Sequence, residues 1–246
     1  MQDSAYDFDF IIIGSGFGGS VSALRLAEKG YKVCILERGK RFKDSDFART
    51  NWDVRRYLWM PLLKCFGIQN LSIFRNILVL SGSGVGGGSL VYANTLLQPG
   101  DEFFKAPVWN ELADWKAELE PFYAVARRML GVATNPKLTF VDEVLRECAH
   151  EMGRGETFKP AEVGVFFGEP GKTVPDPYFD GKGPERSGCI YCGGCMVGCR
   201  FNAKNTLMKN YLWLAERLGV QIIPERAVTD VRPLPEGYEI LTECST

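Results

Sequence analysis

One segment near the start, residues 8–39, constrains the fold of this chain more than any other. It reads FDFIIIGSGFGGSVSALRLAEKGYKVCILERG. Residues 10–13 and 33–36 are short apolar runs without alternation, which is typical of strands buried on both faces of a parallel sheet. Apolar residues recur at helical spacing between the two runs. The segment therefore predicts an α/β fold that opens with a strand–helix–strand unit.

The turn after the first predicted strand has the pattern G-x-G-x-x-G, formed by Gly14, Gly16 and Gly19. In a dinucleotide-binding unit the first glycine permits the tight turn, and the second lets a pyrophosphate approach the backbone. The third allows close packing of helix on strand. The positive N-terminal end of the following helix favours phosphate groups. The alternative is a glycine turn in an α/β protein that binds nothing.

The second predicted strand ends at Glu37, where a carboxylate can accept hydrogen bonds from a ribose diol. A 2′-phosphate would be repelled there, so NADP is disfavoured. This pattern alone does not separate FAD from NAD.

A second glycine-rich segment follows the apolar run at residues 77–80. Five of the seven residues 82–88 are glycine, and Leu90, Val91 and Tyr92 follow almost at once. A flexible linker is the alternative interpretation, but linkers are usually polar between their glycines. The segment predicts a backbone that approaches a phosphate or a flat ring closely, where any Cβ would clash. A flavin fits this better than a nicotinamide, which disfavours an NAD-dependent dehydrogenase.

The two glycine segments together resemble the glucose–methanol–choline (GMC) oxidoreductases, and within that family its bacterial cholesterol-oxidase-like branch. The resemblance rests on LERG at the end of the first segment, on GSGVGGGSLVYANTLLQP, and on three later segments, NWDVRRYLWMPLLKCFGIQ, VGVFFGEPGKTVPDPYF and GCIYCGGCMVGCRFNAKNTLMKNYL. It covers essentially the whole chain. It implies a Rossmann-like FAD-binding domain of the GMC type, incomplete and with an inserted cap or substrate-side segment. It also implies oxidation of an alcohol, with a sterol as the expected substrate, by hydride transfer to FAD.

The resemblance implies a set of cofactor-binding residues. Residues 14–19 would hold the pyrophosphate, Glu37 the adenosine ribose, residues 85–92 the flavin and ribityl chain, and Val228 the adenine. The full set is Gly14, Ser15, Gly16, Phe17, Gly18, Gly19, Glu37, Arg38, Val85, Gly86, Gly87, Gly88, Ser89, Val91, Tyr92 and Val228.

The sequence departs from the family pattern at the expected edge of the flavin. Other members have Asn-Gly-Gly-Met after Ser-Leu-Val, whereas this chain has Tyr92, Ala93, Asn94 and Thr95. The departure leaves the substrate and the electron acceptor open.

Four of the eight cysteines, Cys189, Cys192, Cys195 and Cys199, have the spacing C-x2-C-x2-C-x3-C. This matches the bacterial ferredoxin run, except that Arg200 stands where proline would follow. An iron–sulfur centre is one interpretation, and zinc bound by four thiolates is another. The third is structural, with reduced cysteines packed in the loop before a helix.

The middle of the chain predicts helices followed by a long loop. Residues 109–130 predict two helices interrupted near Pro121, and residues 140–151 predict a helix with Val144, Leu145 and Cys148 facing inward. The loop at residues 164–188, rich in glycine and proline, is expected to cover the flavin's substrate side. We expect three parts: an FAD-binding unit with the flavin-contacting loop at 1–100, an inserted cap segment with the cysteine loop at 101–200, and a truncated return to the FAD-binding domain at 201–246.

No catalytic residue is assigned from the sequence. His150 is the single histidine, and its late place in a polar helix with no nearby partner predicts a surface residue. The family's catalytic histidine lies much later in chains about twice as long. The chain therefore reads as the N-terminal part of such an enzyme, which needs its C-terminal half or a complementary chain. A non-catalytic dinucleotide-binding subunit, with an iron–sulfur centre for electron transfer, is the alternative.

Composition excludes some partners. The net charge of −1 gives no sign of nucleic-acid binding. The first ten residues hold three aspartates and no lysine or arginine, unlike a signal peptide, so a cytoplasmic location is expected, with peripheral membrane association as a second option. Residues 76–100 carry no charge, but their glycines and Pro99 argue against a membrane span.

Overall fold

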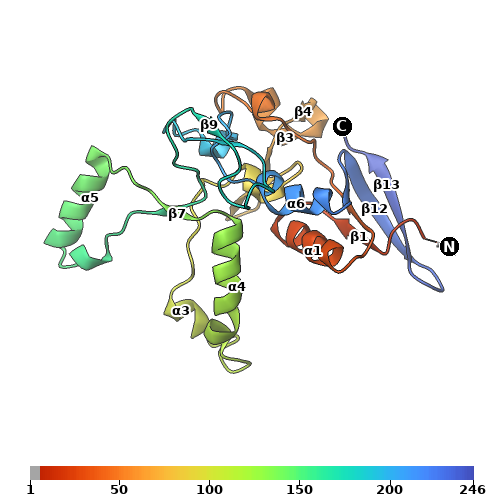
Figure 1. Ribbon diagram of the computed structural model, residues 1–246, viewed down its shortest axis with the longest axis horizontal. Coiled ribbons are helices and arrows are strands. Elements are labelled where there is room, and N and C mark those ends of the chain that lie inside the picture. Colours follow the sequence, from red (N-terminus) through yellow and green to blue (C-terminus); the bar gives the residue numbers. More distant parts are fainter. Residues whose placement is uncertain (1–5) are drawn as a thin grey trace.

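A three-stranded parallel sheet is the frame on which the rest of the chain is arranged (Figure 1). The computed structural model describes residues 6–246. The sheet has the order β1–β2–β11, with β1 spanning Phe10–Ile13, β2 Val33–Leu36 and β11 Gln221–Ile223. The strand–helix–strand prediction is confirmed, and the late strand β11 returns to pair with β2.

The two predicted strands differ in burial. β2 is buried along its whole length, as expected. β1 is not, because it lies at the edge of the sheet: Phe10, Ile11 and Ile13 are 41%, 38% and 58% exposed. The expectation that β1 is buried on both faces was wrong for the described part of the chain.

Two helices, α1 (Phe17–Glu28) and α6 (Tyr211–Arg217), pack together beside this sheet and form the main core. In α1, small and branched residues such as Ala23 and Leu24 allow close contact. Leu212 and Ala215 of α6 are fully buried against them. Gly30 follows α1 in the left-handed conformation, at φ +88°, which a glycine adopts without strain.

Two antiparallel hairpins extend from the sheet. β5 (Gln69–Ile73) pairs with β6 (Leu78–Gly82), and β12 (Arg226–Pro233) pairs with β13 (Tyr238–Cys244). The register of the second hairpin shifts between Val228 and Asp230. The second hairpin begins at the carboxyl edge of the parallel sheet, where the Arg226 N–H donates to the Glu37 carbonyl directly after β2.

The remaining elements are short or project from the body. α4 and α5 point away from the sheet (Figure 1). The other elements are α2 (Val54–Tyr57), β3 (Trp59–Met60), β4 (Cys65–Phe66), α3 (Asp101–Phe104), α4 (Trp115–Met129), β7 (Ala133–Thr134), α5 (Phe140–Glu151), β8 (Glu162–Val163), β9 (Thr173–Val174) and β10 (Arg186–Ser187).

Two details of this middle region differ from the prediction. α4 runs through Pro121 as one helix, although a proline inside a helix removes one main-chain hydrogen bond and crowds the carbonyl four residues earlier. α5 packs mainly against the short turn that follows it, and Val144, Leu145 and Cys148 are exposed rather than inward. The glycine- and proline-rich loop has only two-residue strands, as expected.

No helix within residues 6–246 is long and apolar enough to cross a membrane. The uncharged stretch at 76–100 forms β6, the glycine turn and irregular chain instead.

The contact between α1 and α6 should dominate the stability of the frame. Replacing Leu212, which is fully buried, with alanine is expected to lower the free energy of unfolding by about 2–5 kcal/mol. The exposed Leu218, which directly follows the last residue of α6, is the control, and Leu218→Ala should cost far less. Urea unfolding of both variants measures this, and equal losses would contradict the assigned core.

Candidate functional site

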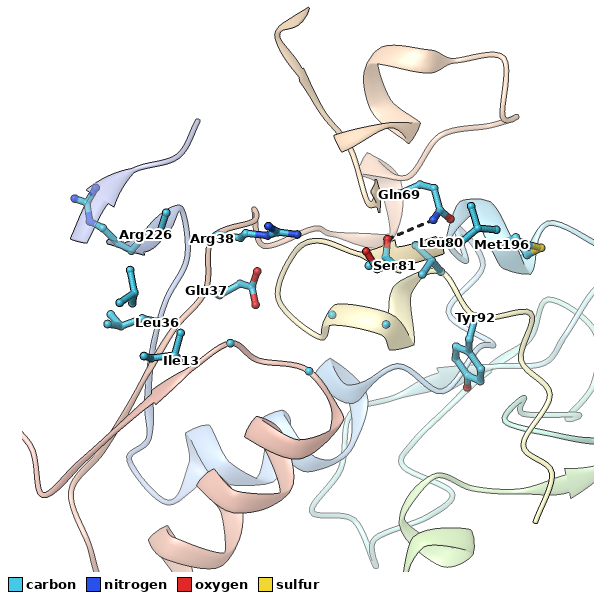
Figure 2. A pocket seen from close by; sticks show the side chains of 18 of the residues that line it. Ile13, Leu36, Glu37, Arg38, Gln69, Leu80, Ser81, Tyr92, Met196 and Arg226 are labelled. Carbon is cyan, nitrogen blue, oxygen red and sulfur yellow. Dashed lines mark hydrogen bonds between the residues drawn. The ribbon is translucent and has the colours of Figure 1, made fainter. Parts of the chain in front are cut away.

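A cavity of about 810 Å³ opens at the carboxyl ends of β1 and β2 (Figure 2). This is the edge at which open α/β sheets bind their ligands, and the volume is within the usual range for such sites. The cavity is lined by Ile13, Gly14, Gly16, Leu36, Glu37, Arg38, Gln69, Leu80, Ser81, Gly82, Gly87, Gly88, Val91, Tyr92, Ala93, Met196, Arg226, Ala227 and Val228. It therefore joins the first glycine turn, the second glycine segment and the start of β12.

The first glycine turn leaves open space on its cavity side. Gly14 has φ +92°, and its N–H donates to the Leu36 carbonyl at 2.8 Å. A Cβ on Gly16 would meet nothing within 4 Å, whereas a Cβ on Gly19 would lie 2.1 Å from the Gly14 oxygen. Gly16 thus borders free space, and Gly19 lets α1 pack closely on the turn.

The N-terminus of α1 faces this space without a cap of its own. Gly16 is the N-cap residue, no side chain bonds to the helix end, and the first turn has no acidic residue. The N–H groups of this turn therefore keep their partial positive charge for an anionic group.

The second glycine segment is shaped first by contacts between backbones. A Cβ on Gly39 would lie 2.2 Å from the Gly84 nitrogen, and a Cβ on Gly82 would lie 2.2 Å from the Gly87 oxygen. Gly84 itself has φ +126°. The glycines thus let backbones touch within this segment and between it and the loop after β2, a reason that differs from the expected contact with a flat ligand. Of this segment, Gly82, Gly87 and Gly88 also line the cavity.

The Glu37 carboxylate joins these loops from a buried position, with 5% of the residue exposed. Its Oε2 accepts from the backbone N–H and the hydroxyl of Ser15, at 3.0 and 2.7 Å. Its Oε1 accepts from the N–H of Gly39 at 2.9 Å and from that of Gly84 at 3.4 Å. Four internal donors match the roughly four acceptor positions of a carboxylate. Glu37 therefore ties the first turn, the end of β2 and the second glycine segment together.

The adenosine-side wall expected from the sequence comes from β2 and β12. Arg38 and Val228 line the cavity, beside the other predicted residue Glu37. Arg226 and Ala227 also line it, which the sequence analysis missed. Their place directly before Val228 in RAVTDV is the signal that could have included them.

The opposite end of the cavity is formed by Val91, Tyr92, Met196 and the β5–β6 hairpin. Gln69 donates through Nε2 to the Ser81 carbonyl at 3.3 Å, which joins the two strands at this wall (Figure 2). Gln69, Ser81 and Met196 were not predicted, because they lie outside both glycine motifs.

Tyr92 is held firmly at this end. Its hydroxyl donates to the Asn205 carbonyl at 2.8 Å, and burial raises the pKa of its phenol. The Lys204 Nζ lies 4.5 Å from the centre of its ring. Lys204 is 1% exposed, and burial lowers its pKa to about 7. Tyr92 thus presents its ring, and not a free hydroxyl, to the site.

The other predicted site residues do not line the cavity. Ser15 is buried and bonds to Glu37, and the Ser15 hydroxyl also accepts from the Gly86 N–H at 3.0 Å. The Ser89 hydroxyl donates to the Gly86 carbonyl and accepts from the Leu207 N–H. The residues outside the cavity lining are Ser15, Phe17, Gly18, Gly19, Val85, Gly86 and Ser89.

Two further candidates lie apart from the large cavity. His150 is exposed on α5, as the sequence predicts. The four clustered cysteines are free and line a second, small cavity. Within residues 6–246, no three metal-binding side chains are placed to hold a single ion.

Comparisons with known proteins agree with this arrangement. The protein-family model for the NAD(P)-binding Rossmann-like domain matches residues 12–42 of this chain. A cholesterol oxidase of Mycobacterium tuberculosis (strain H37Rv) is 55% identical over 96% of this chain and 42% of its own length. A cholesterol oxidase of Acinetobacter baumannii is 50% identical over 100% of this chain and 46% of its own. An uncharacterised GMC-type oxidoreductase of M. tuberculosis (strain CDC 1551) is 35% identical over 87% of this chain and 31% of its own length. The chain spans less than half the length of these relatives.

The bonds of Glu37 should make it a main determinant of the loop arrangement. Glu37→Gln keeps the size of the side chain but replaces one acceptor oxygen with an amide donor that faces N–H groups. We expect this variant to lose about 1–3 kcal/mol of unfolding free energy. The exposed Glu216, paired with Arg41, is the matched control, and Glu216→Gln should cost about 0–1 kcal/mol. Chemical denaturation compares the two, and an unchanged Glu37→Gln midpoint would contradict the joining role.

Proposed function

The chain belongs to the GMC-type oxidoreductases, over the N-terminal part of their length, and on this premise we propose that its large cavity binds FAD. One observation carries the proposal: a single cavity connects the uncapped end of α1, Glu37, the second glycine segment and Val228. An extended dinucleotide with a ring system at each end requires such a connected site. The walls at the far end, at Gly87, Gly88, Val91 and Tyr92, favour the three-ring isoalloxazine of FAD over the single nicotinamide ring of NAD.

The residues fit an anionic, extended cofactor. The open space at Gly16 is the place where an added Cβ would take up room needed by a pyrophosphate. Glu37, Arg38 and Val228 would border the adenosine, and Gly87, Gly88, Val91 and Tyr92 would border the flavin. Ser15, Val85, Gly86 and Ser89 would support these positions from behind.

The reaction we propose is oxidation of an alcohol, with a sterol as the favoured substrate. The cholesterol oxidases that match the chain support this choice. Bound FAD would supply the hydride acceptor. The chain itself would position the ring through Val91 and Tyr92 and keep water from that face by apolar contacts.

A catalytic base is not assigned in this chain. Among the described residues that line the cavity, Glu37 is the single carboxylate and none is a histidine. Glu37 lies at the adenosine end and is bonded to four donors. The Tyr92 hydroxyl donates its hydrogen bond to the Asn205 carbonyl. The base is therefore expected in the part of the relatives that lies beyond this chain.

The domain organisation follows the same proposal. Residues 1–100 and 201–246 would form the FAD-binding domain, since β11 pairs with β2. Residues 101–200 would form the inserted substrate-side segment. The exposed apolar residues of β1 support contact with a further C-terminal part or a complementary chain. A cytoplasmic location agrees with eight free cysteines.

The visible spectrum of the purified chain tests the proposal. A bound flavin released as FAD is the expected result. Bleaching of the flavin by cholesterol without oxygen, in the presence of the proposed C-terminal part or complementary chain, would establish the activity. Flavin that no alcohol bleaches would favour a binding subunit, and NADH binding without flavin would contradict the proposal.

A pair of glycine variants locates the pyrophosphate. Gly16 and Gly18 both face open space, but Gly16 lines the cavity and Gly18 is exposed outside it. Gly16→Val should lose most of its bound flavin, because its side chain occupies the phosphate position, whereas Gly18→Val should retain it. Flavin per chain, from absorbance after release, measures both. Full retention by Gly16→Val would contradict the phosphate assignment.

A further inference from the structure

The Tyr92 end of the large cavity is built by two segments that are far apart in the sequence. Val91 and Tyr92 lie just after the second glycine segment, whereas Met196 belongs to the cysteine loop, residues 189–199 (Figure 2). Tyr92 also opens the stretch in which the sequence departs from the family pattern. The contacts that hold these two segments together therefore determine the shape of this wall.

The side chain of Lys204 lies between the two segments and is 1% exposed. Its Nζ donates to the Leu90 carbonyl at 2.9 Å and to the Cys195 carbonyl at 2.8 Å. Leu90 directly precedes Val91, and Cys195 directly precedes Met196. Each hydrogen bond thus fixes the main chain just before a residue of the cavity wall. Two N–H donors are enough for both bonds, so they form whether the side chain is an ammonium or a neutral amine.

The ring of Tyr92 is held by three further contacts. The Lys204 Nζ lies 4.5 Å from the centre of the ring. The Tyr92 hydroxyl donates to the Asn205 carbonyl at 2.8 Å. The ring of Phe17, from α1, packs nearly perpendicular to it, with ring centroids 6.4 Å apart. Residues 204 and 205 thus hold both the face and the hydroxyl of this ring.

Asn205 is itself fixed by its side chain. Its Oδ1 accepts from the Arg186 guanidinium, and its Nδ2 donates to two carbonyls directly after α4, at 3.0 and 3.2 Å. Arg186, which is 1% exposed, also donates to the Lys204 carbonyl at 2.9 Å. Side-chain hydrogen bonds therefore hold the main chain of residues 204 and 205 where Tyr92 meets it.

A second hydrogen bond joins the same two segments. The Asn94 Nδ2 donates to the Cys195 sulfur at 2.9 Å, and the Asn94 carbonyl accepts from the Gly164 N–H at 2.7 Å. Asn94 has φ +64°, a left-handed conformation that asparagine adopts more readily than most residues with a Cβ. The stretch 92–95, where the sequence departs from the family pattern, is thus attached to residues 195–205 at both Tyr92 and Asn94.

From these contacts we propose that Lys204 is a positioning residue for the flavin end of the site, where it holds the Tyr92 ring and the wall at Met196 in place for the isoalloxazine. The inference rests on the proposed function, because it concerns how the chain would hold bound FAD. The contacts of Lys204 lie only at this end of the cavity, and Glu37 lies at the other (Figure 2). Loss of its amino group should therefore weaken contact with the flavin half of the cofactor and spare the adenosine half.

The test compares the binding of FAD and of ADP to the full chain by isothermal titration calorimetry. ADP carries the adenosine diphosphate half of FAD without the flavin, so it reports on the opposite end of the cavity. Lys204→Met removes the nitrogen and keeps an unbranched side chain. We expect this variant to bind FAD about tenfold more weakly than the wild-type chain, and to bind ADP equally well.

Lys209→Met is the matched control. The Lys209 side chain is only 11% exposed, but it pairs with Asp44 and does not line the cavity. Its loss should change the affinities for FAD and ADP to the same extent. Circular dichroism checks that each variant is folded. Asn94→Gly removes the bond to Cys195 and keeps the left-handed backbone without strain, so it should show the same selective loss if Lys204→Met does not fold.

Three results would overturn the inference. They are FAD binding by Lys204→Met equal to that of the wild-type chain, equal losses of FAD and ADP binding in this variant, or an equally selective loss of FAD binding in Lys209→Met. Where Lys204→Met does not fold, unchanged FAD binding by Asn94→Gly has the same consequence. A wild-type chain that binds no FAD would instead contradict the proposed function itself.

Discussion

The Glu37 carboxylate is the interaction on which the arrangement of the large cavity depends. It receives N–H and hydroxyl donors from the first glycine turn, the end of β2 and the second glycine segment. These three loops come from distant parts of the sequence, and each contributes backbone to the cavity wall. Without this shared acceptor, several buried N–H groups would lack partners.

Glycine has two separate tasks in this site. At Gly16 the missing side chain leaves open space for a ligand. At Gly39 and Gly82 it lets one backbone touch another, since a Cβ would lie 2.2 Å from a main-chain atom. The close packing of the loops therefore also determines where the cavity leaves room for a cofactor.

The sequence predicted those features that depend on local pattern. The order of β1, α1 and β2 followed from apolar periodicity and the glycine spacing, and Glu37 from the distance between the turn and the end of the next strand. Features that depend on distant neighbours were missed. The exposure of β1 results from its place at the sheet edge, and Leu145 is exposed because, within residues 6–246, no element covers that face of α5. Gln69, Ser81 and Met196 reach the cavity through tertiary contacts that no local motif indicates.

The central claim is that one FAD molecule lies along the cavity from Val228 to Tyr92. The most direct measurement is the difference electron density of a crystal of the chain grown with FAD. The account predicts adenine density beside Val228, phosphate density at the N-terminus of α1, and isoalloxazine density against Gly87, Gly88 and Tyr92. FAD bound elsewhere, or a cavity filled by the protein's own side chains, would contradict it.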